Sequence, residues 1–231
     1  MSMGEAVEFP SNGSTASGYL ATPEGGQGPG VLVIQEWWGL VPQLKGVADR
    51  LAGEGFVALA PDLYHGDMAT HQEMDKAGKL MSEMPPDRAA RDMGGAVSFL
   101  LDHSATIGHK VGVVGFCMGG MLTLLITALE GDRVGAAAPF YGFPQGESEP
   151  DWSKLTAKVR GHMAENDDFF SPEAARALES KLRGMGKDVQ FTVHPGTGHG
   201  FGNEESPLGT YDKDAYEQAW AETVELFKSE L

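Results

Sequence analysis

The sequence predicts an α/β protein with a mostly parallel central sheet of about eight strands and helices on both faces. Short runs of apolar, β-branched residues alternate along the chain with longer helix-like segments. One run, residues 31–34, is apolar throughout, which is typical of a strand that is buried on both faces of a parallel sheet. With 231 residues, of which 41% are hydrophobic, the chain can bury one sizeable core. We therefore expect a single domain over residues 1–231.

The elements follow one another in a regular order. The chain is expected to open with a short hairpin, residues 6–9 and 18–21, and a glycine-rich turn at residues 25–30. The other expected strands are residues 31–34, 56–60, 110–114, 134–139, 159–164 and 189–194. The expected helices are residues 42–53, 71–84, 88–101, 121–129, 172–185 and 212–231. Pro85 and Pro86 separate the second helix from the third. The acidic stretch 143–152 is expected to be an exposed loop.

Composition excludes several classes of partner. The formal net charge of −16 argues against nucleic acid and against an anionic membrane as partners. No apolar run approaches the ~20 residues of a membrane span, and residues 1–20 lack the pattern of a signal peptide. We therefore expect a cytoplasmic protein. We also expect a monomer or small homo-oligomer that acts on a small molecule, although composition alone does not identify the substrate.

The only cysteine, Cys117, lies where an expected strand gives way to a helix. Gly115 and Gly119 flank it with the spacing of the nucleophile elbow G-x-S-x-G, with sulfur in place of oxygen. The turn is strained, and a side chain at either glycine would collide with the neighbouring strand or helix. A lone cysteine is usually a small buried hydrophobe, but the residues on both sides favour an elbow. One cysteine also excludes an intrachain disulfide and a cysteine-based zinc site.

An acid and a histidine follow later strands. In sheets of this kind ligands bind beyond the carboxyl ends of the strands. Asp167 follows the expected strand 159–164, and His199 follows the expected strand 189–194. The order cysteine, acid, histidine is the chain order of the α/β-hydrolase triad. In such a triad His199 would deprotonate Cys117, and Asp167 would fix the tautomer of the histidine.

Alternatives to this triad remain. Asp168 could replace Asp167, which is preferred because it comes earlier in the turn, with Phe169 and Phe170 expected to pack behind it. A metal held by His194, His199 and Asp167 is disfavoured, since no histidine pair at i, i+4 and no cysteine set supports it. The first strands are followed by no glycine-rich phosphate loop. We therefore expect neither a metal nor a cofactor.

Glu36 directly follows the buried strand 31–34. A carboxylate there costs free energy unless it is paired or protonated. Glu36 could make a structural hydrogen bond to a neighbouring loop, or it could be an acid near Cys117 that holds or takes the thiol proton. The same turn should supply the N–H of Trp37 as a second oxyanion donor, beside the N–H of Met118.

Five segments together resemble the dienelactone hydrolase (carboxymethylenebutenolidase) family, and the resemblance runs from about residue 31 to residue 201. They are Gln35-Glu36-Trp37-Trp38-Gly39, Ala60-Pro61-Asp62-Leu63-Tyr64, Gly115-Phe116-Cys117-Met118-Gly119-Gly120, Phe140-Tyr141-Gly142 and His199-Gly200-Phe201. The resemblance implies an α/β-hydrolase fold. It also implies that Glu36 contacts the resting thiol and activates it when substrate binds, and that Tyr141 lines the pocket. We expect Tyr64 and Asn203 among the substrate-binding residues.

The sequence departs from the family at the substrate carboxylate. Enzymes of this family that act on dienelactone hold that carboxylate with arginines, one of them four residues after the catalytic histidine. Here that position is Asn203, and the helical stretch 71–76 offers only Lys76. We therefore expect a carboxylic ester hydrolase that cleaves an enol lactone or activated ester through a thioester. The alternatives are a carboxylesterase of different specificity, a redox-sensing or binding protein, and an acyl transferase to an acceptor other than water.

Overall fold

The computed structural model describes residues 4–11 and 13–231, and the chain divides into two compact units. The N-terminal unit comprises Met1–Gly112 together with Leu231, and the C-terminal unit comprises Val113–Glu230. The boundary falls inside strand β5 (Thr106–Phe116), which therefore contributes residues to both units. Counted through β5, the strands form an eight-stranded sheet in the order β1-β2-β4-β3-β5-β6-β7-β8. The predicted fold class is confirmed.

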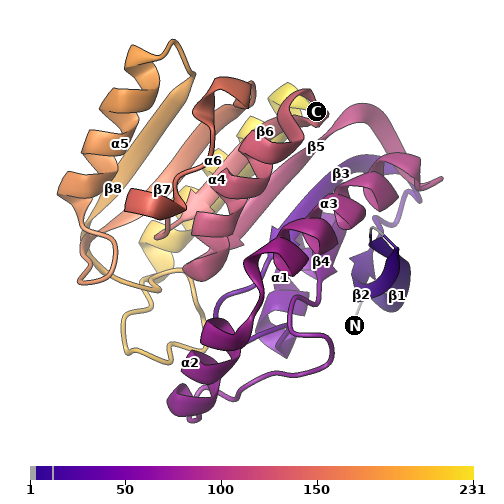
Figure 1. Ribbon diagram of the computed structural model, residues 1–231, viewed down its shortest axis with the longest axis horizontal. Helices are drawn as coiled ribbons and strands as arrows, with labels where there is room; N and C mark the ends of the chain where they lie inside the picture. The colour runs from indigo at the N-terminus through magenta and orange to yellow at the C-terminus, as the bar shows by residue number, and fades with distance from the viewer. Residues whose placement is uncertain (1–3, 12) are drawn as a thin grey trace. The chain divides into compact units, whose positions relative to one another are not determined.

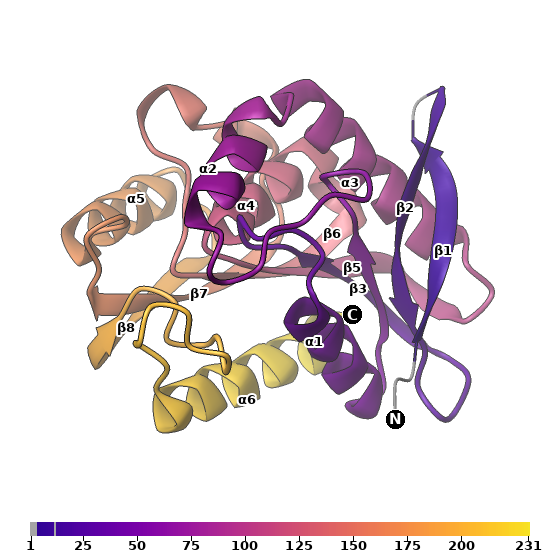
Figure 2. The ribbon, with the colours of Figure 1, turned by 90° about the horizontal axis from the view of Figure 1, so that it is seen from below.

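The N-terminal unit contains the antiparallel part of the sheet. Its other strands are β1 (Gly4–Ser11), β2 (Ser14–Ala21), β3 (Gly28–Ile34) and β4 (Val57–Pro61), and its helices are α1 (Pro42–Gly53), α2 (Met74–Glu83) and α3 (Pro86–Asp102). β1 pairs with β2, and β2 with β4, in antiparallel register, whereas β3 and β4 are parallel. Within this unit α1 covers one face of the sheet and α3 covers the other (Figure 2).

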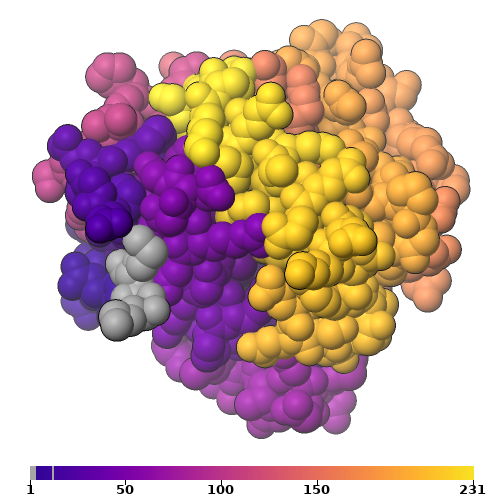
Figure 3. Space-filling view, turned by 180° about the vertical axis from the view of Figure 1, so that it is seen from behind, coloured from indigo at the N-terminus to yellow at the C-terminus, as the bar shows by residue number. Residues whose placement is uncertain are grey.

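The C-terminal unit continues the sheet with parallel strands. They are β6 (Val134–Phe140), β7 (Lys158–Asn166) and β8 (Val189–Gly198), and the helices are α4 (Met118–Glu130), α5 (Pro172–Gly184) and α6 (Lys213–Glu230). In this unit α4 and α5 lie on one face and α6 on the other (Figures 1 and 2). Figure 3 shows α6 and the segment before it, in yellow, at the surface. Within the described ranges, every helix is too short or too polar to span a bilayer.

Local sequence explains these elements. Val31, Leu32, Val33 and Ile34 are fully buried in β3, as the continuous apolar run predicts. β6 is buried along its whole length. Ser171 caps helix α5: its hydroxyl accepts the N–H of Ala174 at 3.2 Å, and Pro172 is the first helical residue.

Two expectations about loops need correction. The turn expected at 25–30 is shorter, because β3 already begins at Gly28. A Cβ at Gly28 would lie 2.0 Å from the oxygen of Gly55, so this glycine permits a close approach of two backbones. The stretch 143–152 is not exposed throughout, since Phe143 and Trp152 are buried at its two ends. Several elements also extend beyond their expected bounds. In particular, α4 begins at Met118 and β8 ends at Gly198.

Candidate active site

Cys117 occupies a strained turn between β5 and α4. Its backbone has φ 56° and ψ −117°, a region that non-glycine residues rarely adopt. Its N–H donates to the oxygen of Phe140 at 3.0 Å, which joins the turn to the end of β6. A Cβ at Gly115 would lie 2.3 Å from the oxygen of Gly119, so only glycine fits where the strand meets the helix. The geometry is that of a nucleophile elbow.

Asp167 lies just beyond β7, and its two carboxylate oxygens have different partners. Oδ1 accepts the N–H of Phe169 at 2.8 Å and the N–H of Phe170 at 2.9 Å. Oδ2 lies 2.8 Å from Nδ1 of His199. The Asp167 side chain is fully buried, whereas Asp168 is exposed. The two backbone donors fix the carboxylate and leave one oxygen directed at the histidine.

His199 lies between this carboxylate and the thiol. Its Nε2 is 3.1 Å from Sγ of Cys117. Since Asp167 only accepts, Nδ1 carries the proton of that hydrogen bond, and Nε2 is the nitrogen that faces sulfur. A hydrogen bond from the Thr210 hydroxyl to the His199 carbonyl, 2.5 Å, holds the backbone. Within the C-terminal unit, His199 therefore contacts Asp167 through Nδ1 and Cys117 through Nε2.

Aromatic rings surround the imidazole. Tyr141 has its ring centroid 5.2 Å from that of His199, in an edge contact, and Phe170 stacks at 5.9 Å. Phe169 is 4.9 Å from the imidazole but is 64% exposed. The expectation that both phenylalanines pack behind Asp167 is therefore wrong for Phe169. Its contribution to the carboxylate is its backbone N–H.

Two further predicted residues belong to the same unit. Met118 is buried at the first position of α4, where backbone N–H groups point out of the helix end. Asn203 is also buried, and its Oδ1 accepts the N–H of Glu205 at 3.1 Å. Asn203 thus stabilises the turn that follows Phe201.

The other predicted residues belong to the N-terminal unit. Glu36 is buried just after β3, and Trp37 is half-buried. The hydroxyl of Tyr64 donates to the carbonyl of Trp37 at 3.1 Å. Oε1 of Gln35 accepts the N–H of Leu63 at 3.2 Å. These two bonds join the turn after β3 to the turn after β4.

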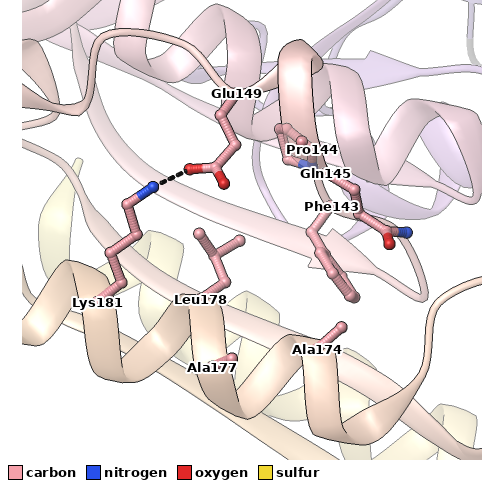
Figure 4. Close-up of a pocket in the computed structure, with 9 residues that line it drawn as sticks. Phe143, Pro144, Gln145, Glu149, Ala174, Ala177, Leu178 and Lys181 are labelled. Carbon is pink, nitrogen blue, oxygen red and sulfur yellow. Dashed lines mark hydrogen bonds and ion pairs between the residues drawn. The ribbon is translucent and has the colours of Figure 1, made fainter.

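A cavity of about 270 Å³ lies between the loop after β6 and helix α5 (Figure 4). Its walls include Phe143 and Leu178, and Lys181 lies 2.5 Å from Glu149 at its rim. Phe143 contacts Phe170 at a centroid distance of 5.3 Å. Phe170 in turn stacks on the candidate catalytic imidazole, so one aromatic ring connects this cavity to His199.

The sequence did not predict a buried pair of histidines. His162 on β7 and His194 on β8 are both buried, and Nδ1 of the first lies 3.2 Å from Nε2 of the second. Burial lowers the pKa of His162 to about 3 and also lowers the pKa of His194. His194, which the disfavoured metal hypothesis used, therefore faces His162, while Asp167 faces His199. Among residues 4–11 and 13–231, no group of three His, Cys, Asp or Glu side chains could hold a metal ion.

Comparison with known proteins identifies the relatives of this chain. The sequence model of the dienelactone hydrolase family matches residues 16–231. Protein usf of Aquifex pyrophilus is 40% identical over 235 residues, covering 99% of this chain and 100% of that protein. A protein of Aquifex aeolicus, provisionally named a carboxymethylenebutenolidase, is 38% identical over the same shares of the two chains. A crystal structure from Klebsiella pneumoniae, provisionally titled a dienelactone hydrolase, superposes with a TM-score of 0.84 at 25% identity and covers 97% of this chain and 98% of that one.

Proposed function

Because the chain belongs to the dienelactone hydrolase family, we propose that it hydrolyses an ester or enol-lactone bond through a thioester on Cys117. The observation that carries the proposal is the contact of Nε2 of His199 with Sγ of Cys117 at 3.1 Å, while Nδ1 lies 2.8 Å from Asp167. Nucleophile, base and orienting acid then occupy the three positions that covalent acyl transfer requires.

The reaction proceeds in two halves. His199 takes the thiol proton, sulfur attacks the carbonyl carbon, and the oxyanion is held by the N–H of Met118. When the tetrahedral intermediate collapses, the bond to the leaving oxygen breaks and His199 gives that oxygen its proton. A water molecule, deprotonated by His199, then attacks the thioester. The acyl carbon–sulfur bond breaks, the carboxylic acid product leaves, and the thiolate takes back the proton from His199. By the family resemblance, Glu36 activates the resting thiol and Trp37 supplies a second oxyanion donor.

Sulfur narrows the substrate class. A thiolate leaves a tetrahedral intermediate more readily than an ordinary alkoxide does, so an alkyl ester intermediate tends to revert. An enolate or phenolate leaves readily enough to compete. We therefore propose enol lactones and activated esters as substrates, with simple alkyl esters slower and amides very poor.

The residues that would bind a substrate carboxylate differ most from those of the family. Asn203 replaces the expected arginine, is buried and bonds Glu205. Lys76 already lies 3.2 Å from Asp67. Neither residue offers the two-pronged recognition that a guanidinium gives a carboxylate. We therefore propose an acyl group less charged than that of dienelactone.

The test is steady-state hydrolysis of p-nitrophenyl acetate and of cis- and trans-dienelactone by the wild type and by Cys117→Ala. Turnover of the aryl ester, abolished in the variant, together with an acyl-enzyme mass on the wild type, supports the proposal. Turnover of the dienelactones as well would show that the arginines are dispensable. Stoichiometric labelling of Cys117 without turnover of any of the three would contradict it and favour redox sensing or acyl transfer.

A further inference from the structure

The buried histidine pair has one consistent hydrogen-bonding direction. The hydroxyl of Thr223, on α6, donates to the carbonyl of Ala219 at 2.9 Å. Its oxygen must therefore accept from His162, whose Nε2 lies 3.2 Å away. With its proton on Nε2, His162 has a lone pair on Nδ1, and that nitrogen accepts the Nε2–H of His194. The chain of bonds runs from β8 through β7 to α6.

The pair lies on the strands that carry two members of the triad. Asp167 follows His162 by five residues, and His199 follows His194 by five. Between these points the β7–β8 register becomes irregular: Ala164 pairs with His194, but Asn166 pairs with Gly198. Regular pairing therefore cannot by itself fix the distance between the two loops, and a directional side-chain bond just before the irregularity can.

The surroundings connect the pair to the imidazole of His199. The carbonyl of His162 accepts the N–H of Tyr141 at 2.7 Å, and the Tyr141 ring contacts His199. His194 packs on Phe201 at a centroid distance of 5.0 Å, and Phe201 packs on Tyr141 at 5.3 Å. A shift of His162 would therefore reach the imidazole of His199 through Tyr141, and a shift of His194 would reach it through Phe201 and then Tyr141.

We propose that His162 and His194 are positioning residues, which set the separation of Asp167 and His199 and so the alignment of His199 with Cys117. The positioning role depends on the proposed function in one respect only, namely which reaction Cys117 and His199 catalyse once they are aligned. An apolar pair could fill the same space but would lack the hydrogen bond that selects one distance.

The bond requires His162 to be neutral, because its Nδ1 must accept. A proton on Nδ1 of His162 would set two donors against each other. The acidic groups around the pair are Glu222, whose Oε2 is 3.9 Å from Nδ1 of His162, and Asp212. Glu222, and Asp212 to a smaller extent, oppose the effect of burial on the pKa of His194. Phe140 contacts His162 at a centroid distance of 4.7 Å, and Tyr216 in turn contacts Phe140 at 6.3 Å. Burial outweighs these acids and lowers the pKa of both histidines.

The experiment compares His194→Phe with His194→Gln, since a glutamine Nε2 can donate to His162 and a phenylalanine cannot. The first readout is the rate at which iodoacetamide alkylates Cys117, measured by intact mass at pH 6 and at pH 9. The alkylation ratio is the rate at pH 6 divided by the rate at pH 9. This readout needs no ester hydrolysis and depends on how His199 supports the thiolate. The second is kcat and KM for p-nitrophenyl acetate, with the melting temperature as a check of folding.

His194→Phe is expected to lower the alkylation ratio and kcat by about 10- to 100-fold, with little change in KM, and His194→Gln should restore most of both. Thr223→Val, a milder variant, should act in the same direction. Its matched control is Thr127→Val. The Thr127 hydroxyl donates to the carbonyl of Thr123 within α4, away from the histidine pair, so its loss should change neither readout.

A folded His194→Phe protein with wild-type ratio and kcat would overturn the proposal. So would a His194→Gln protein that melts like the wild type yet is as defective as His194→Phe. A wild type that alkylates as expected but hydrolyses no ester would contradict the proposed function alone, and the response of the ratio to the variants would still decide the positioning role.

Discussion

A Cβ atom at Gly142 would lie 1.9 Å from the backbone oxygen of Cys117, so the segment after β6 touches the nucleophile turn directly. The same two segments are joined by the hydrogen bond from the N–H of Cys117 to Phe140. Gly120 shows the same closeness, since its Cβ would lie 2.5 Å from the Phe140 oxygen. The strained backbone of Cys117 is thus held by the end of the neighbouring strand as well as by its own helix.

Gly142→Ala is therefore expected to lower both stability and activity. The added methyl must push Cys117 out of its turn, and overpacking of this kind costs about 1–3 kcal/mol. Thermal unfolding and the rate of Cys117 alkylation measure the two effects. Gly184→Ala is the matched control, because a Cβ at this last residue of α5 meets nothing within 4 Å. Equal behaviour of the two variants would show that the turn tolerates the methyl.

Asp167→Asn is expected to reduce kcat by about 10²- to 10⁴-fold. The amide oxygen can still accept from Phe169 and Phe170, which leaves the NH₂ group facing Nδ1 of His199. Nδ1 must then accept, Nε2 carries the proton, and the histidine cannot take one from Cys117. Asp168→Asn removes the same charge from an exposed neighbour and should leave kcat within about twofold. A similar loss in both variants would argue against Asp167 as the orienting acid.

Ser171→Ala is expected to affect stability alone. Its hydroxyl caps α5, and removal of such a cap costs about 0.5–2 kcal/mol. Chemical denaturation measures the loss. The Asp167 carboxylate is fixed by the backbone of residues 169 and 170, which precede the cap, so kcat should not change. A large fall in kcat would show that the catalytic acid depends on how α5 begins.

The sequence was sufficient to predict the fold and those site residues that directly follow a strand. The elbow glycines, the chain order of Cys117, Asp167 and His199, and the buried apolar strands all follow from local patterns, and the structure has these residues at the ends of β5, β7 and β8. Local patterns could not decide which atoms hold Asp167. Two backbone N–H groups, those of Phe169 and Phe170, hold the carboxylate, and this depends on the shape of the turn. The sequence alone predicts instead that the side chains of these two residues pack behind Asp167.

The histidine pair could not be predicted because it depends on register. His162 and His194 are 32 residues apart, and each is one of several polar residues in its strand, so nothing in the local pattern singles it out. Only the β7–β8 alignment, in which His162 pairs with Thr192 and Ala164 pairs with His194, brings the two rings together. The same limit applies to the loop 143–152, where the partners of Phe143 come from the segments that hold Phe170 and Phe191.

His162 also predicts how stability depends on pH. Its pKa is about 3 in the folded protein and 6.5 in the unfolded chain, so the unfolded state binds the extra proton between these values. The free energy of unfolding is then highest above about pH 6.5 and falls as the pH drops toward 3, by ~1.4 kcal/mol per pH unit from this group. His162→Gln, which can accept from His194 and donate to Thr223, removes the titration. Urea unfolding at pH 7, 6, 5 and 4 should give a shallower decline in the variant than in the wild type. The many carboxylates titrate in both proteins and cancel in the difference. Parallel curves would show that the folded protein binds a proton at His162 as readily as the unfolded chain does.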